Sequence, residues 1–423
     1  MLIHWLALLF LFLESGPQNY HIDWDDRQGL RRSLGLLYYG LPTVDADDCD
    51  MARCFSHDRR CGTSPDDFTI ALYPPGAGLA IQGLDGAPVV PSKWWIDTRA
   101  ALRASKYFVE DPEKACVLVP NFEHTLASNE MGTSLVIAQT LRSLPTWERY
   151  GGPGFNHLLF NKHDDVGVEY DPAYAMVAKV GWSTGHYRPA FDISLNPPCG
   201  KGRPGLKDAA GHVVPTWWAN PDRKRENKYF LTFLGTMRNY PLRRAIAERF
   251  HDPDNGVIIQ TSVEEQIGGK PSVEVEYLDT LFHTQFTLCP RGRALYSYRT
   301  TEAIAAGAIP VILGDGYAFP YNELIDWRSF AVILPESSWE TMMDVLRSFT
   351  SEEIARMRRN MGIAYNKIFK NDSTLMDTTL DILRMNIYRQ RGGGHYSFGQ
   401  FKHVAAHPFG HPLYFSPEEH SAR

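Results

Sequence analysis

Three arginines and a glycine gather in one short stretch of the chain, directly after an apolar run that ends at Leu288. Arg291 and Arg293 flank Gly292, and Arg299 follows six residues after Arg293. Guanidinium groups present planar sets of donors that match phosphate oxygens, and glycine lets a ligand come close to the backbone. We therefore predict an anion site here. The alternative is that these arginines are ordinary solvated charges.

The helix expected over 297–306 adds to the predicted anion site. Its first backbone N–H groups, near Ser297, have no partner within the helix and lie at the positive end of the helix dipole. Glu302 follows one turn later, where a carboxylate would accept hydrogen bonds from ribose hydroxyls. Arg238 comes directly after another apolar run and is a second candidate for binding a diphosphate. The pattern predicts a site for a nucleotide diphosphate.

The elements that must position these residues are short apolar runs that alternate with helical patterns. The first half predicts strands over 68–73, 115–119, 157–161 and 191–195, and helices over 98–105, 133–144 and 173–180. The second half predicts strands over 229–234, 257–260, 286–288, 309–313 and 330–334, and helices over 241–250, 277–282 and 297–306. Such alternation is typical of α/β proteins with a parallel sheet covered on both faces. In an open sheet of this kind the carboxyl ends of the strands border the ligand site, and the basic loop falls at such an end.

Two helices with capping boxes are expected near the carboxyl end of the second half. The boxes run from Ser337 to Glu340 and from Thr350 to Glu353. In each, the first side chain would accept from the helix backbone and the glutamate would accept in return. The second helix carries an apolar stripe at helical spacing, which we assign to the core.

Length and composition fit a folded protein of two domains. The chain has 423 residues, 43% of them hydrophobic and 22% charged, with a net charge of −6. These values exclude a disordered or polytopic membrane chain, and they leave no uniform positive field for a nucleic acid backbone. The expected segments are a targeting segment over 1–20, a cysteine-containing region over 21–66, a first α/β domain over 67–205, a linker over 206–227, a second α/β domain over 228–390 and a flexible tail over 391–423.

The amino terminus and the cysteines indicate the compartment. The apolar run from Trp5 to Leu13 is too short to span a bilayer and has the length of a signal-peptide core, so we predict a signal peptide or signal-anchor. A buried first element is the alternative. Cys49, Cys54 and Cys61 lie in a polar stretch that suggests disulfides in an oxidising lumen, with zinc as the weaker alternative.

The motifs together resemble a known family. The run CPRGR at 289–293, the pattern S-x-R-x-x-E-A-x-x-A-G-x-I-P-V-x-L from 297, and the FP and IDW elements at 319–327 are similar to the exostosin family of glycosyltransferases. The cysteine spacing over 49–61, D-P-x-x-A-C at 111–116 and R-P-x-F-D-x-S at 188–194 resemble the glucuronyltransferase half of animal exostosins. The resemblance covers most of 45–390.

This resemblance implies a GT-B fold, in which two Rossmann-like domains face an interdomain cleft. It places the acceptor on the first domain and the nucleotide sugar on the second. It also implies inversion at the anomeric carbon, so that a UDP-sugar gives a β-linked product. Only one of the two catalytic halves of animal exostosins is matched, so a bifunctional copolymerase is not expected. The implied location is the lumen of the Golgi or endoplasmic reticulum.

An inverting transfer needs a base for the acceptor hydroxyl and positive groups for the departing diphosphate. Asp164 and Asp165 follow a predicted strand and are the preferred bases, with His163 beside them; Glu123 and His124 follow another strand. The cations named above would serve the diphosphate, so no metal or other cofactor is expected. The acidic pairs at 45–47 and 252–254 lie in a cysteine region and a turn, which does not favour a metal site.

The donor, the acceptor and even catalysis stay open at this stage. Glucuronic acid leads by resemblance, with Arg188, Arg243 or Arg244 as candidate partners of its carboxylate, while galactose, xylose and other sugars are alternatives. The acceptor would be a glycan or polysaccharide. The chain could instead be a catalytically quiet partner in a homo- or hetero-oligomer with another exostosin-like chain, or a lectin. The only membrane contact expected is through the amino-terminal segment.

Overall fold

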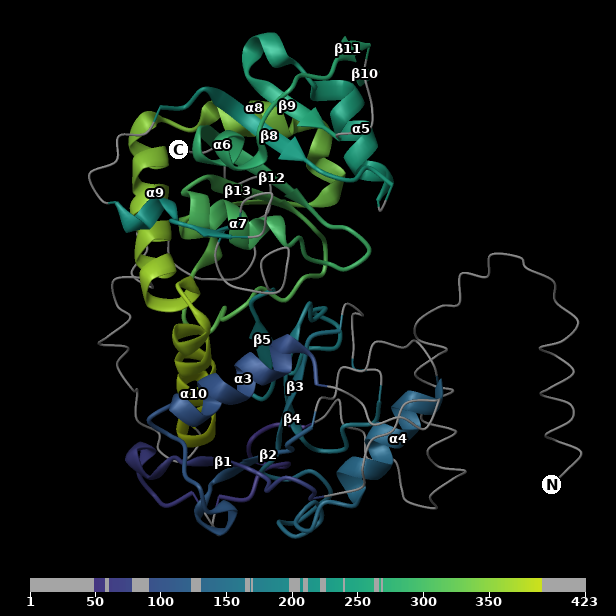
Figure 1. The fold of residues 1–423 in the computed structure, drawn as a ribbon, viewed down its shortest axis with the longest axis vertical. Coiled ribbons are helices and arrows are strands. Elements are labelled where there is room, and N and C mark those ends of the chain that lie inside the picture. Colours follow the sequence, from purple (N-terminus) through teal and green to yellow (C-terminus); the bar gives the residue numbers. More distant parts are fainter. Residues whose placement is uncertain are drawn as a thin grey trace, which may run out of the picture. The chain divides into compact units, whose positions relative to one another are not determined.

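The structure is a computed structural model that describes residues 49–57, 61–77, 91–122, 131–163, 168, 170–197, 206–207, 212–220, 226–238, 240–261, 266–267 and 269–389. All of these lie in one compact unit, Ala46–Arg423 (Figure 1). The predicted targeting segment over 1–20 and the predicted tail over 391–423 lie outside the described residues. Within them, no helix combines the length and the apolar character needed to cross a membrane.

The first half of the unit contains five short parallel strands. Strands β1 (Ile70–Leu72) and β2 (Val117–Val119) pair with each other, and β3 (Leu158–Asn161), β4 (Met176–Val180) and β5 (Ile193–Leu195) form a second set in that order. A parallel bridge from Leu118 to His157 connects the two sets. Every strand residue is buried, as expected for a sheet covered on both faces. The helices of this half are α3 (Lys93–Ala104) and α4 (Met131–Arg142).

The helix predicted over 173–180 is wrong, because this segment contains β4. Ala173 has a positive φ of 49°, a left-handed conformation from which a right-handed helix cannot start. The five residues of β4, Met176–Val180, are all buried, and they pair with β3 on one side and β5 on the other. A short apolar run fits a buried strand as well as a buried helix, and here the neighbouring strands decide.

The second half contains a five-stranded, all-parallel sheet in the order β14-β13-β12-β8-β9. The strands are β8 (Tyr229–Leu234), β9 (Val257–Gln260), β12 (Thr284–Pro290), β13 (Ile309–Leu313) and β14 (Val332–Leu334). The helices are α5 (Pro241–Phe250), α6 (Tyr277–Phe282) and α7 (Arg299–Ala306), of which α7 packs on β12 and β13 (Figure 1). The chain leaves β8 for β9 on one side and then returns to place β12 on the other side. The strand order therefore reverses between β8 and β12.

Two small antiparallel ribbons complete the sheets, one between the two halves and one after β9. A two-stranded antiparallel ribbon of β6 (Leu206–Lys207) and β7 (Val213–Val214), followed by a 3₁₀ turn at Trp217–Ala219, lies within the predicted linker. Trp218 donates from its indole nitrogen to the carbonyl of Ile304 at 2.8 Å. A second ribbon, β10 (Gln266–Ile267) with β11 (Lys270–Pro271), follows β9. The α/β fold class is confirmed, and two parallel sheets in succession agree with the GT-B type.

The carboxyl-terminal helices are α8 (Met342–Ser348), α9 (Ser351–Ala364) and α10 (Asp372–Arg389), with a π-helical turn at Tyr365–Phe369 between the last two. The capping box from Thr350 to Glu353 is confirmed. The box at Ser337 is wrong, because Ser337 lies inside a 3₁₀ helix, Glu336–Thr341, that begins after Pro335. Asp315 accepts from the backbone nitrogen of Glu336 at 3.1 Å, so this turn is stabilised from another loop.

Helix α10 packs on α3 of the first half (Figure 1). The hydroxyl of Tyr107 donates to Asp381, and the hydroxyl of Tyr388 donates to the carbonyl of Cys61 at 2.8 Å. Cys61 forms a disulfide with Cys116. These contacts connect the last helix of the described residues to the segments around β1 and β2.

The predicted disulfides are present, although only one lies within the cysteine cluster. Cys49 pairs with Cys54, whereas Cys61 pairs with Cys116 at the entry of β2. The fifth described cysteine, Cys289, is buried without a disulfide, and burial raises the pKa of its thiol to about 12.

A second set of contacts joins the segment after β4 to the loop after β13. Ser183 and Tyr317 form an antiparallel bridge, supported by a 2.8 Å hydrogen bond from the Thr184 nitrogen to the Gly316 carbonyl. The hydroxyl of Tyr187 donates to the buried carboxyl of Glu323. Burial raises the pKa of Glu323 above its ordinary value.

Close packing at the end of β4 requires a glycine. Gly181 has a φ of 77°, and a Cβ atom there would lie 2.7 Å from the ring of Tyr296. Tyr296 belongs to the loop after β12. The carboxyl end of β4 therefore contacts the same loop that carries the predicted anion site.

Candidate functional site

The predicted anion-binding residues lie around the point where the strand order of the second sheet reverses. Strands β8 and β12 are neighbours in parallel register, so their carboxyl ends lie at the same edge. The loop after β8 carries Gly235 to Arg238, and the loop after β12 carries Arg291 to Ser297. Ligands of open α/β sheets bind at such a reversal, because the loops on either side of it diverge.

Arg291 lies over the ring of Tyr240, with its guanidinium carbon 4.9 Å from the ring centre. Its Nε atom is 3.9 Å from a carboxylate oxygen of Glu336, and its side chain is 25% exposed. This is a loose ion pair, which leaves the terminal nitrogens of Arg291 available to an anion. Arg293 and Arg238 are exposed, and Arg238 forms no ion pair within the described part of the chain.

The glycines of the two loops lie close to arginine side chains. A Cβ atom at Gly292 would lie 3.1 Å from a terminal nitrogen of Arg243. A Cβ atom at Gly235 would lie 2.7 Å from a terminal nitrogen of Arg299. Each loop therefore approaches a guanidinium group with its bare backbone. The sequence indicated a close approach at Gly292, but to a ligand and not to a second arginine.

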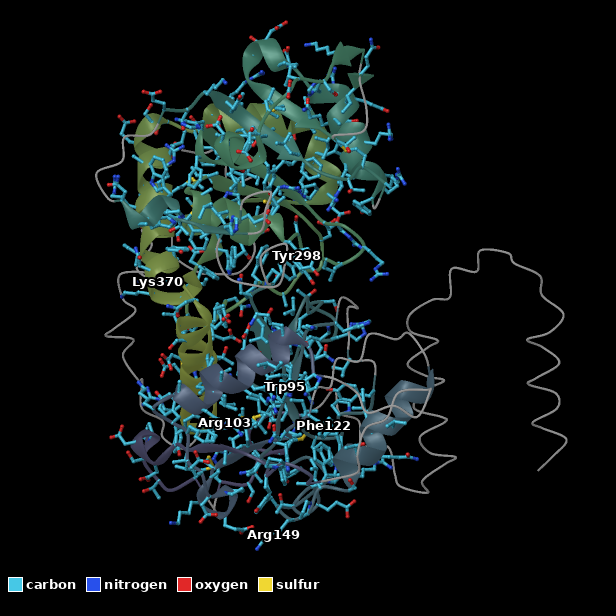
Figure 2. All side chains as sticks on the ribbon, in the orientation of Figure 1. Trp95, Arg103, Phe122, Arg149, Tyr298 and Lys370 are labelled. Atoms are coloured by element: carbon cyan, nitrogen blue, oxygen red, sulfur yellow. A yellow bond between two sulfur atoms is a disulfide. The ribbon has the colours of Figure 1, made fainter. Side chains whose placement is uncertain are left out.

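Helix α7 begins at Arg299, two residues after the start predicted at Ser297. Its N-cap residue is Tyr298, which makes no side-chain cap and is 41% exposed; Figure 2 labels this residue. Ser297 is buried and precedes the helix. The free backbone donors of the helix start therefore lie two residues further along the chain than expected.

Arg299 and Glu302 point toward the body of the second half. The guanidinium of Arg299 lies 4.4 Å from the ring centre of Phe233 and donates to the carbonyl of Leu234. Its Nε atom is buried without a hydrogen-bond partner in the described residues. Glu302 accepts from the hydroxyl of Tyr277. The roles predicted for Arg299 in binding phosphate and for Glu302 in binding ribose stay predictions.

The predicted base residues fall partly outside the structure. Asp164, Asp165, Glu123 and His124 lie outside the described residues. His163 is described: its backbone nitrogen donates to the side chain of Asn161 at 2.8 Å. The choice of base therefore stays a prediction.

Polar side chains gather at the carboxyl ends of β2, β3 and β4 in the first half. Lys179 is fully buried and donates to the carbonyls of His163 and Val180. Arg99 donates to the side chain of Asn121 at 3.1 Å and has no ion pair within the described residues. Arg99 and Asn121 are partly exposed and can donate hydrogen bonds to a hydroxylated or anionic ligand, whereas the amino group of Lys179 is used within the protein.

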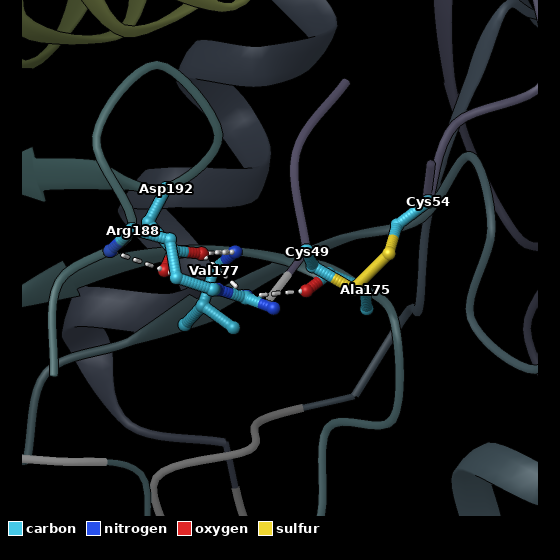
Figure 3. Close-up of polar contacts among 6 residues, drawn as sticks. All are labelled: Cys49, Cys54, Ala175, Val177, Arg188 and Asp192. Atoms are coloured by element: carbon cyan, nitrogen blue, oxygen red, sulfur yellow. Dashed lines mark hydrogen bonds and ion pairs between the residues drawn. A yellow bond between two sulfur atoms is a disulfide. The ribbon is translucent and has the colours of Figure 1, made fainter. Parts of the chain in front are cut away.

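The arginines considered for a donor carboxylate have other partners. Arg188 forms a two-pronged ion pair with Asp192 and also donates to the carbonyl of Ala175 at 2.8 Å (Figure 3). Arg244 lies 4.0 Å from Glu248 on an exposed face of α5. Arg243 is buried against backbone carbonyls. These contacts give Asp192 a structural role.

One acidic pair considered as a metal site is described, and it has another partner. Asp252 lies 2.6 Å from the amino group of Lys270, which lowers its pKa together with the hydrogen bond from Asn255. The pair at 45–47 lies outside the described residues. Among the residues with assigned positions, no three His, Cys, Asp or Glu side chains form a metal-binding group. Metal independence stays a prediction.

Comparisons with known proteins identify the family. Residues 93–349 match the Exostosin GT47 domain. The chain is 28% identical to Exostosin-1a of Danio rerio over 401 residues, which cover 88% of this chain and 51% of that protein. It is 26% identical to Exostosin-1 of Bos taurus over 406 residues, which cover 89% of this chain and 49% of that protein. The chain thus spans about half the length of these relatives.

Two solved structures show some likeness to the chain. An α1,3-fucosyltransferase with GDP is 12% identical, with a TM-score of 0.33, covering 81% of this chain and 97% of that one. TarM is 10% identical, with a TM-score of 0.31, covering 54% of this chain and 55% of that one. Scores this low add nothing to the assignment. The matched domain, which extends over more than half of the sequence and includes the basic loop after β12, shows that the chain belongs to the Exostosin GT47 family of glycosyltransferases.

Proposed function

We propose that this chain is an inverting glycosyltransferase that moves a sugar from a UDP-sugar to a glycan acceptor. The observation that carries the proposal is the reversal of strand order between β8 and β12, with basic loops following both strands. A nucleotide diphosphate bound there would meet Arg291, Arg293 and Arg238. The start of α7 would add backbone donors and the positive end of its dipole.

The proposed reaction is a single displacement at the anomeric carbon. The acceptor hydroxyl loses its proton to a base and its oxygen forms the new bond to the anomeric carbon. The bond from that carbon to the diphosphate breaks on the opposite face, and UDP leaves with the electron pair. The arginines of the two loops would stabilise the charge that develops on the diphosphate, because fixed donors need no reorganisation during the reaction.

We propose Asp164 or Asp165 as the base, with His163 beside them. The support is their position in the sequence, a few residues after β3 ends at Asn161. Asn121, which follows β2, and Arg99 of α3, which donates to it, are proposed to bind the acceptor. Replacing the correct base by its amide should abolish turnover and leave the affinity for UDP unchanged.

Glucuronic acid is proposed as the transferred sugar, in the lumen of the secretory pathway. The support is the resemblance of the motifs to the glucuronyltransferase half of animal exostosins. The two disulfides agree with this compartment, since such bonds persist where the environment is oxidising. Galactose and xylose are the competing donors.

A donor panel tests the proposal. UDP release is measured with UDP-glucuronic acid, UDP-galactose and UDP-xylose, for the wild type, Arg291→Ala and Arg293→Ala. Arg249→Ala, on an exposed position of α5, is the control. Turnover with one donor that is lost in both loop variants and kept in the control supports the enzyme. UDP binding without turnover on any donor would favour a quiet partner subunit, and glycan binding that ignores UDP would favour a lectin.

A further inference from the structure

A buried arginine beneath the proposed donor site has no carboxylate partner. Arg243 lies in the first turn of α5 and is 7% exposed. It shares its face of the helix with Ile246 and Ala247, both of which are buried. Arg243 forms no ion pair within the described residues. A charge inside a protein is costly unless something compensates it, so its position requires a reason.

The guanidinium of Arg243 joins the two loops at the reversal of strand order. Its Nε atom donates to the carbonyl of Arg291 at 3.0 Å, and one terminal nitrogen donates to Pro290 at 3.1 Å. The other terminal nitrogen donates to the carbonyl of Thr236 at 3.0 Å. One rigid, planar group therefore fixes the backbone after β12 against the backbone after β8.

A second guanidinium shares this position. Arg243 and Arg299 both lie against the ring of Phe233, at 5.4 Å and 4.4 Å from its centre. Burial, together with the neighbouring charge of Arg299, lowers the pKa of Arg243 to about 10. Arg243 still carries its charge at neutral pH. Two positive groups thus lie under the loops, held by carbonyl dipoles and aromatic faces.

We propose that Arg243 is a positioning residue for the diphosphate of the donor. It holds the 290–292 backbone so that Arg291 and the amide of Gly292 face the phosphates, and the charge of the bound diphosphate balances the buried guanidinium pair. This inference rests on the proposed function, because it assigns a role within the same nucleotide site. It predicts that replacing Arg243 weakens ligand affinity more as the negative charge of the ligand increases.

The test compares ligands that differ only in phosphate. Affinities for uridine, UMP and UDP are measured by calorimetry on the wild type, Arg243→Gln, Arg243→Lys and the control Arg249→Gln. We expect Arg243→Gln to weaken UDP binding by about tenfold or more and to change uridine binding by less than about threefold. Arg243→Lys keeps the charge without the three carbonyl contacts, so its affinity for UDP should lie between those of Gln and the wild type.

A purely structural role predicts a different result. Equal losses for uridine and UDP, or UDP affinity within about twofold of the wild type, would overturn the positioning role. Should Arg243→Gln fail to fold, Arg243→Lys provides the second variant, because it keeps the charge and loses the planar group that contacts the three carbonyls. Loss of UDP affinity with uridine binding retained is again expected, and unchanged UDP affinity would again contradict the inference.

The outcome for the wild type separates this inference from the proposed function. UDP binding and turnover in the wild type, combined with an unaffected Arg243 variant, would leave the transferase standing and remove only the role of Arg243. Absence of UDP binding in the folded wild type would remove both.

Discussion

Removing the Arg188 side chain should strongly destabilise the first half, because it leaves a carboxylate buried without its cation. The Arg188 and Asp192 side chains are 10% and 0% exposed, and their closest charged atoms are 2.7 Å apart. Asp192 also accepts from the backbone of Val177 at 2.9 Å, so it fastens the start of β4 to the turn before β5 (Figure 3). For Arg188→Met we expect a loss of about 3–5 kcal/mol in the free energy of unfolding.

The sharper prediction concerns the double variant. Changing Asp192 to Asn in the Arg188→Met background removes the uncompensated charge and keeps an oxygen for the Val177 backbone. The second substitution should therefore restore about 1–3 kcal/mol, although it is expected to destabilise the protein when made alone. This reversal of sign follows from the buried charge and not from the loss of contacts.

Urea unfolding followed by tryptophan fluorescence measures these differences, provided that the slope with denaturant stays constant among the variants. The control is Arg149→Met. The side chains of Arg149 (labelled in Figure 2) and its partner Glu113 are 54% and 60% exposed, and their closest charged atoms are 3.1 Å apart. That pair should contribute less than about 1 kcal/mol. If Arg188→Met costs no more than the control, or if the double variant is the least stable of the set, the reasoning about the buried pair is refuted.

Three further results are expected. Gly181→Ala should lower stability by about 1–3 kcal/mol, because the backbone there is left-handed and the ring of Tyr296 is close. Gly185→Ala should be nearly neutral, because no heavy atom lies within 4 Å of the added carbon. Thermal unfolding compares the two variants. Because burial raises the pKa of Glu323, the folded state holds a proton that the unfolded state releases. The free energy of unfolding should therefore fall as the pH rises above the ordinary glutamate pKa. Glu323→Gln should flatten this dependence when unfolding is measured at several pH values. An unchanged slope would show that Glu323 does not titrate in this way. Replacing the Cys61–Cys116 disulfide by two alanines should cost about 2–5 kcal/mol in chemical unfolding without reductant, and an unchanged midpoint would contradict its structural role.

Several elements of the second half follow directly from local sequence. The bounds predicted for β8, α5, β9, α6 and β13 agree with the structure. In α5, Pro241 stands at the first position, where the missing N–H costs nothing. Gly307 ends α7 in a left-handed conformation, and the apolar run of β13 follows it. Such signals act over a few residues and need no knowledge of the rest of the chain.

The errors arise where distant residues decide. The segment of β4 is a strand because β3 and β5 lie on either side of it, and nothing within its five residues separates that outcome from a buried helix. Ser337 has the spacing of a capping box, but the carboxylate of Asp315, from another loop, accepts from the start of that turn. Cys61 has two cysteines close in sequence and pairs with neither.

The candidate site shows the same division. Residue types and their place after apolar runs were sufficient to predict Arg291, Arg293 and Arg238 as neighbours of an anion, and the structure places them on the two loops that follow β8 and β12. The binding of an anion by these residues stays a prediction. The sequence carried one signal for Arg243, which is a charged residue on the face of α5 that bears Ile246 and Ala247, but it could not show what that charge contacts.

The sequence alone determined the α/β class, the alternation of strands and helices and the family, because these depend on periodicity and on residues that are close in the chain. Tertiary structure alone decided the order of the strands, and with it the pairing of the loops after β8 and β12. It also decided that Arg243 is buried between those loops while Arg238 is exposed. The physical reason is that a buried guanidinium needs hydrogen-bond acceptors, and those of Arg243 include the carbonyls of Pro290 and Arg291, which lie far away in sequence.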